Sequence, residues 1–179
     1  LFAGFTVGCV GPGLMMSTMG LVLKDSIGDG ITAGGVTIGV ATLAGALMAS
    51  RWIADLGAPF LGGLTDRIGR RRGGTLFFVA GALILAGASL QEGEWWLIPA
   101  IIFYFACATG ATVALVAEAG SRGPRVVASY VTASDFGSFA GPILGWSMPQ
   151  LALPVEFIFI LGGCLYAVAG CVVFLMFEE

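Results

Sequence analysis

The sequence contains no histidine, and charged residues make up only 11% of its 179 residues. Histidine is the most common metal ligand in proteins and the usual proximal ligand of haem, so such sites lose their main donor. Without it, no nucleophile and base pair or cluster of metal ligands can be assembled from the remaining residues. We therefore expect a protein that is not an enzyme and that binds no cofactor and no metal ion.

Basic residues are also scarce. The chain has 8 Lys and Arg against 11 Asp and Glu, with a formal net charge of -3, so we expect no nucleic-acid partner. The 4 cysteines all lie inside apolar runs, where cysteine behaves as a small core residue and does not suggest a disulfide framework.

Apolar residues are abundant. Hydrophobic residues account for 58% of the chain, and the mean hydropathy is +0.97, more apolar surface than a soluble domain of this length encloses. The apolar runs are continuous and do not alternate with period two, which favours membrane helices over barrel strands. We therefore predict an all-α integral membrane protein of the cell (inner) membrane, embedded in the lipid bilayer. With charged clusters taken as boundaries, the predicted transmembrane helices are residues 2–23, 32–64, 75–90, 96–117, 126–148 and 155–177.

The distribution of basic residues predicts the orientation of these helices. Residues 67–72 hold four arginines between the second and third helices, and Arg122 and Arg125 lie between the fourth and fifth. The alternate loops carry acidic residues such as Asp25 and Asp29. By the positive-inside rule the arginine-bearing loops are cytoplasmic, so both termini are expected in the cytoplasm.

Residues 62–72 read GGLTDRIGRRR and concentrate much of the charge. Gly62 would allow a close helix approach, and Gly69 a tight turn with positive φ. The pattern G-x-x-x-D-R-x-G-R-R resembles the signature of the major facilitator superfamily, in the loop between helices two and three. The matching residues are Gly62, Asp66, Arg67, Gly69, Arg70 and Arg71.

The resemblance implies that this loop acts as a conformational latch, which forms in one state and breaks in another. Glu118, at the cytoplasmic end of the fourth helix, matches the acidic position that pairs with a motif arginine. The alternative is that the arginines only set topology and bind anionic lipid headgroups. We favour the latch for Asp66, Arg67 and Arg70, and the alternative for Arg72.

The fifth predicted helix contains GSFAGPILG, with Gly137, Gly141, Pro142 and Gly145. Proline removes a backbone donor and, with flanking glycines, favours a helix bend. Close helix packing is the alternative role for the glycines. The motif resembles the glycine-proline motif of the family's drug and metabolite antiporters.

The family fold has two six-helix bundles around a central cavity, so the resemblance covers one half and implies a second six-helix bundle as partner. The antiporter-like motif favours the N-terminal half. Against it, the family's antiporters carry an arginine in helix four, which is missing here, and the chain ends soon after its last apolar run. We favour the C-terminal half slightly.

Three charges lie deeper in the predicted helices. Arg51 and Asp55 are four residues apart, on one helical face, and Asp135 has no opposite charge within one turn. A charge near the bilayer midplane costs several kcal/mol unless it is paired or hydrated. All three are candidates for substrate binding or ion coupling, with Asp135 as a proton carrier. The alternatives are a self-satisfied Arg51 and Asp55 pair, and a structural Asp135 held by Thr132, Ser134, Ser138 or Arg51.

These expectations lead to two functional hypotheses. The first is secondary active transport of a small solute by alternating access, coupled to protons, as half of a carrier. The second is a non-transporting structural or assembly subunit that retains the transporter fold within a larger membrane complex. A lone half would expose the polar groups of its cavity, so both hypotheses require membrane partners.

Overall fold

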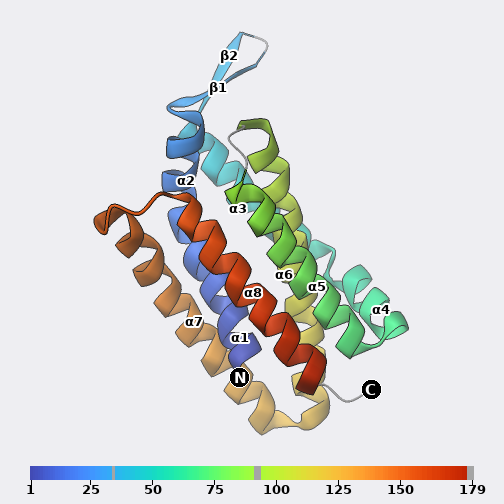
Figure 1. The fold of residues 1–179 in the computed structure, drawn as a ribbon. Coiled ribbons are helices and arrows are strands. Elements are labelled where there is room, and N and C mark those ends of the chain that lie inside the picture. Colours follow the sequence, from blue (N-terminus) through green and yellow to red (C-terminus); the bar gives the residue numbers. More distant parts are fainter. Residues whose placement is uncertain (34, 91–93, 177–179) are drawn as a thin grey trace.

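The computed structural model shows a bundle of long helices with a β-hairpin protruding from one end (Figure 1). The residues that it describes are 1–33, 35–90 and 94–176.

The first helix is continuous but changes its winding. It consists of α1 (Phe2–Gly8), the π-helix η1 (Cys9–Met16) and α2 (Ser17–Ile27). Pro12 lies inside η1 and cannot donate a backbone hydrogen bond, so the regular α-helical pattern cannot be maintained there. The predicted helix over residues 2–23 is therefore present, with a wider turn at its centre.

The structure differs from the prediction at residues 32–39, which do not begin a helix. Strands β1 (Gly30–Ala33) and β2 (Val36–Gly39) form an antiparallel hairpin in which Ile31 pairs with Ile38 and Thr32 with Thr37. The two threonine hydroxyls are 3.1 Å apart. β-Branched residues facing each other across two strands favour a hairpin, and the apolar run concealed this pattern in the sequence.

The second predicted helix, 32–64, is also interrupted. It comprises α3 (Val40–Leu56) and α4 (Ala58–Ile68), separated at Gly57. Pro59 lies in the first turn of α4, where its missing N–H is tolerated because the first N–H groups of a helix have no partner within the helix.

The remaining helices extend beyond their predicted limits at most ends. They are α5 (Arg70–Ser89), α6 (Glu94–Arg122), α7 (Pro124–Gln150) and α8 (Glu156–Met176). The last residue of the predicted span 155–177 lies outside the described part of the chain. The predicted connection between residues 64 and 75 is much shorter than expected, because helix α4 continues to Ile68 and only Gly69, with φ of 89°, separates it from α5.

In the described part of the chain, four helices are long and apolar enough to cross a membrane: Phe2–Ile27, Arg70–Ser89, Trp96–Arg122 and Glu156–Met176. The helical fold class is thus confirmed apart from the hairpin, and a membrane protein is compatible with these helices. The other two predicted spans are not in this set. The break at Gly57 leaves α3 and α4 with 17 and 11 residues, and α7 has 27 residues but carries many glycine, proline and polar residues.

Each long helix packs against specific neighbours in the bundle. Helix α5 lies against α8 and α6, α7 lies against α1 and η1, and both α3 and α4 lie against α6. The start of α1, the end of α8 and the turns at Gly69 and Gly123 lie together, opposite the hairpin (Figure 1). We call this side of the bundle the arginine-rich end, because the arginines of residues 67–72 and Arg122 lie there.

Candidate functional site

A charged cluster lies within the bundle, where α3 meets α6. Arg51 and Asp55 form an ion pair one helical turn apart on α3. A guanidinium N–H of Arg51 donates to the Thr109 hydroxyl of α6 at 2.9 Å, and that hydroxyl donates to the Asp55 carboxylate at 2.8 Å. These three residues, here called the Arg51 cluster, form a closed ring of hydrogen bonds between two helices.

The Arg51 cluster is only partly shielded. The side chains of Arg51 and Asp55 are 16% and 36% exposed, whereas Thr109 is buried. Oppositely charged groups in contact need less solvation than isolated ones, so the ring stabilises both charges in apolar surroundings. The exposed edge of Asp55 leaves part of its carboxylate accessible from outside the bundle. The pairing predicted from the spacing of Arg51 and Asp55 is confirmed.

Tyrosine hydroxyls add to this polar region. Tyr104 of α6 donates to Tyr166 of α8 at 3.2 Å, and both side chains are fully buried. Sequence analysis missed Thr109 and these tyrosines. The signal that identifies them is a hydroxyl placed inside an apolar helix, where each polar group needs a partner.

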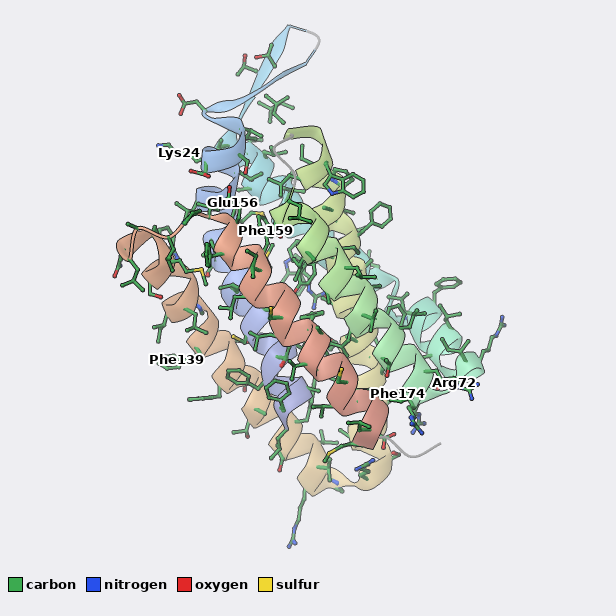
Figure 2. The ribbon with its side chains drawn as sticks, viewed as in Figure 1. Lys24, Arg72, Phe139, Glu156, Phe159 and Phe174 are labelled. Carbon is green, nitrogen blue, oxygen red and sulfur yellow. The ribbon has the colours of Figure 1, made fainter. Side chains whose placement is uncertain are left out.

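Asp135 is not brought to the Arg51 cluster. It lies on an exposed face of α7 and has no hydrogen bond or ion pair with any described residue. The predicted hydroxyl partners are engaged elsewhere, since Thr132 donates to the Ala128 carbonyl and Ser138 to the Ser134 carbonyl. On the same helix, the labelled ring of Phe139 points away from the bundle (Figure 2).

A second charged cluster lies at the arginine-rich end. Arg122 Nε donates to Glu118 Oε1 at 2.7 Å, while Arg70 Nη1 lies 3.9 Å from Glu118 Oε2. A second nitrogen of Arg122 reaches the Met176 carbonyl at 3.5 Å. Glu118, Arg70 and Arg122 are here called the Glu118 cluster. It joins α5, α6 and the end of α8.

The structure brings together only part of the predicted latch. Glu118 and Arg70 meet, but Asp66 and Arg67 are exposed, and Asp66 pairs with no described residue. Arg71 instead stacks on the Phe174 ring of α8, with its guanidinium carbon 4.4 Å from the ring centre. Sequence analysis missed Arg122 as the main partner of Glu118, although its spacing of four residues indicates such a pair.

The two motif glycines of this region have different roles. Gly69 has φ of 89°, as the tight-turn prediction requires, and an added side chain there would be strained. Gly62 faces α6, and a Cβ at this position would lie 3.4 Å from a methyl group of Val113. Gly62 thus lies at a helix contact that has room for a small side chain.

The glycines of the α7 motif are buried against the first helix. A Cβ at Gly137 would lie 2.1 Å from the Phe5 carbonyl oxygen, and one at Gly141 would lie 2.3 Å from the Cys9 carbonyl oxygen. A Cβ at Gly145 would lie 2.6 Å from a methyl group of Thr18. These glycines therefore permit close backbone packing, and α7 remains one helix through Pro142.

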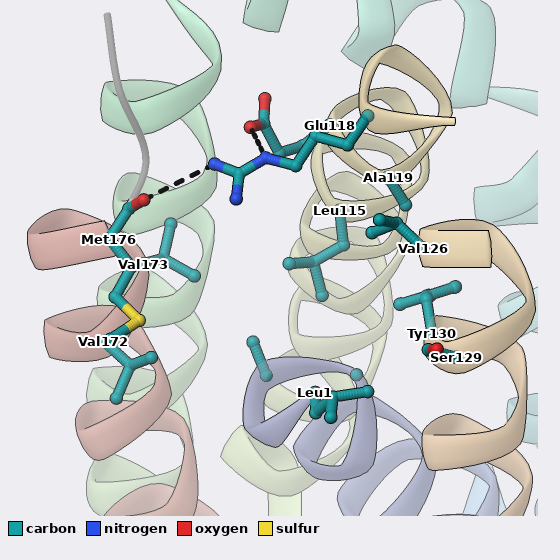
Figure 3. Close-up of a pocket in the computed structure, with 13 residues that line it drawn as sticks. Leu1, Leu115, Glu118, Ala119, Val126, Ser129, Tyr130, Val172, Val173 and Met176 are labelled. Carbon is teal, nitrogen blue, oxygen red and sulfur yellow. Dashed lines mark hydrogen bonds and ion pairs between the residues drawn. The ribbon is translucent and has the colours of Figure 1, made fainter. Parts of the chain in front are cut away.

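A pocket of about 360 Å³ opens beside the Glu118 cluster, among α1, α6, α7 and α8 (Figure 3). Its wall is mostly apolar and includes Leu115, Val126 and Val173, with the Tyr130 side chain on the α7 side. Glu118 lies at its edge and accepts the hydrogen bond drawn in Figure 3. The pocket therefore combines an apolar wall with a charged rim.

Within the described ranges, no group of three His, Cys, Asp or Glu side chains is placed to hold a metal ion. The chain matches no protein-family model and no curated protein sequence. The functional interpretation therefore depends on the residues and their geometry.

Proposed function

We propose that the chain is one half of a major facilitator-like secondary transporter, which moves a small solute across a membrane by alternating access with proton coupling. The observation that carries the proposal is the Arg51 cluster. Its closed ring holds two partly shielded charges and a buried hydroxyl where α3 meets α6, and charges between apolar helices are costly and are retained mainly for function.

Asp135 supports the need for a partner. A carboxyl group on an outward, mid-helix face with no partner among the described residues is unfavourable against lipid. A second six-helix bundle would cover this face and place Asp135 at the interface between the halves. There, loss of its charge on protonation would change how the halves pack, which is the coupling role that we assign to it.

The Glu118 cluster supports a conformational role for the arginine-rich end. Glu118 holds Arg122 at hydrogen-bond distance and Arg70 slightly beyond it, so a small movement of the turn at Gly69 exchanges its partners. We infer that this end is cytoplasmic, with both chain termini on that side, because the basic residues concentrate there. In this arrangement the Gly69 turn is the moving part of the latch.

The test is solute uptake by vesicles that contain the complete wild-type assembly, with and without an imposed proton gradient. A panel of labelled small solutes is screened first, and the variants are then compared on the transported solute. We expect Arg51→Ala and Asp135→Asn each to reduce gradient-driven uptake at least about tenfold, because each removes a charge from the proposed pathway. Asp135→Asn should leave solute exchange without a gradient largely intact.

The matched control is Arg125→Gln, which removes an exposed charge from the first turn of α7, outside both clusters. Its uptake should equal that of the wild type. Unchanged uptake in both Arg51→Ala and Asp135→Asn would overturn the assignment of the coupling residues. No uptake of any solute by the wild-type assembly, together with a fixed stoichiometry to other membrane subunits, would instead favour the structural-subunit hypothesis.

A further inference from the structure

Two separate pockets lie between the α4–α5 pair and α6. The first, at the arginine-rich end, has a volume of about 590 Å³ and is lined by Arg67, Ile68, Arg70–Arg72, Asp66 and Glu118. The second has a volume of about 190 Å³ and a wholly apolar wall that includes Leu61, Phe77, Ile84, Trp96 and Phe103. The transport mechanism proposed above uses the Gly69 turn and the Arg70 contact with Glu118 at the edge of the first pocket, but it uses neither pocket as a binding site.

The two pockets are aligned along the same helix faces. On α4, Leu61 lines the apolar pocket and Ile68 the arginine pocket, seven residues or about two turns apart. Leu64 lies between them on the same face and is exposed. On α5, Arg70 lines the arginine pocket and Phe77, seven residues later, lines the apolar pocket. The two pockets are therefore about 10 Å apart along the helix axes.

The arginine pocket carries an excess of positive charge. Four arginines line it against two carboxylates, and the Glu118 carboxylate is already occupied by Arg122, which does not line the pocket. Arg71 Nε is buried and has no hydrogen-bond partner among the described residues. Guanidinium groups bind phosphate oxygens through paired N–H donors, so this pocket suits a phosphate group.

From this alignment we propose that the arginine pocket and the apolar pocket form one binding site for an anionic phospholipid. The phosphate lies among Arg67, Arg70 and Arg71, and an acyl chain follows Leu64 of α4 into the apolar pocket. A free phosphate would satisfy the arginines but not the apolar pocket, and a neutral lipid would do the reverse. The inference depends on the membrane placement of the bundle but not on transport.

Trp96 provides a direct measurement, because its indole ring lines the apolar pocket. The purified full chain in neutral detergent is titrated with phosphatidylglycerol brominated on its acyl chains, which quenches nearby tryptophan fluorescence. We expect a saturable component of quenching that Trp96→Phe removes, above the unsaturable quenching of the other three tryptophans. Brominated phosphatidylcholine should require at least about fivefold more lipid, and Arg67→Gln and Arg70→Gln should each weaken binding about fivefold, the amount expected for one basic residue.

The control is Arg125→Gln, which should bind phosphatidylglycerol as tightly as the wild type does. Inorganic phosphate and glycerol 3-phosphate should not displace the brominated lipid at equal concentration. Displacement by either would indicate a soluble-anion site and overturn the proposal. Equal quenching by phosphatidylcholine would also overturn it, because the site would then not select an anionic lipid. Unchanged affinity in both arginine variants would do the same, because the binding would then not depend on the arginine pocket.

Discussion

The Arg51 cluster and the Glu118 cluster each contain an arginine and an acidic residue four positions apart on one helix, but the order of the two residues is reversed. In the first, an arginine precedes an aspartate by four residues on α3, and in the second a glutamate precedes an arginine by four residues on α6. Their surroundings differ. The Arg51 side chain is 16% exposed and is bonded to a buried hydroxyl, whereas Arg122 is 46% exposed at the end of the bundle.

The surroundings of an ion pair therefore decide whether the pair is stable or can easily change partners. The Arg51 cluster is a closed ring, so opening it leaves charge in poorly solvated surroundings. At the Glu118 cluster, water and Arg70 can replace Arg122, so the pair contributes little and exchanges easily. The first arrangement suits a fixed polar point inside the bundle, and the second suits a latch.

The largest effect should come from opening the Arg51 cluster. We expect Arg51→Met to reduce the free energy of unfolding by about 2–3 kcal/mol, because the Asp55 carboxylate loses its counter-charge while remaining half-buried. Denaturant titration of the protein in mild detergent, followed by circular dichroism, measures this change.

The double variant Arg51→Met with Asp55→Leu is the control for this prediction. It removes both charges, so most of the lost stability should return, although uptake by the complete assembly should remain impaired. If the double variant is as unstable as the single one, the lost packing of the long Arg51 side chain, and not the unpaired charge, is the cause.

A smaller effect should come from the hydroxyl that closes the ring. Thr109→Val keeps the shape of the side chain but removes one acceptor for Arg51 and one donor to Asp55. We expect a loss of about 1–2 kcal/mol in the same titration. Thr109→Ser retains the hydroxyl and should lose less than half as much, and an equal loss in both variants would show that the methyl group matters more than the ring.

Sequence patterns predicted those parts of the fold that depend on local spacing. Long apolar runs identified α5, α6, α7 and α8, and a spacing of four residues identified the Arg51 and Asp55 pair. The hairpin at residues 30–39 was missed because its two strands are short and lead directly into the apolar run of α3, so composition alone does not distinguish them from the start of a membrane helix.

The parts that could not be predicted depend on contacts between distant helices. Nothing in the sequence places Thr109 beside Arg51, since 58 residues separate them and only the packing of α3 on α6 joins them. Similarly, the α7 glycines were recognised as a motif, but only the backbone of the first helix shows why a Cβ cannot fit. The role of Asp135 depends on a surface outside this chain and stays a prediction.

The smallest effect should come from the Glu118 cluster. Arg122→Gln removes the closest partner of Glu118, but Arg70 can move into hydrogen-bond distance, so we expect a loss of only about 0.5 kcal/mol. The loss should fall further in about 0.5 M salt, since exposed charges are screened there, whereas the loss in Arg51→Met should change much less.

Adding Arg70→Gln to Arg122→Gln removes the substitute partner of Glu118, and the double variant should lose more stability than the two single variants combined. A strictly additive result would mean that Arg70 does not replace Arg122, and the latch would then need a different pair of residues.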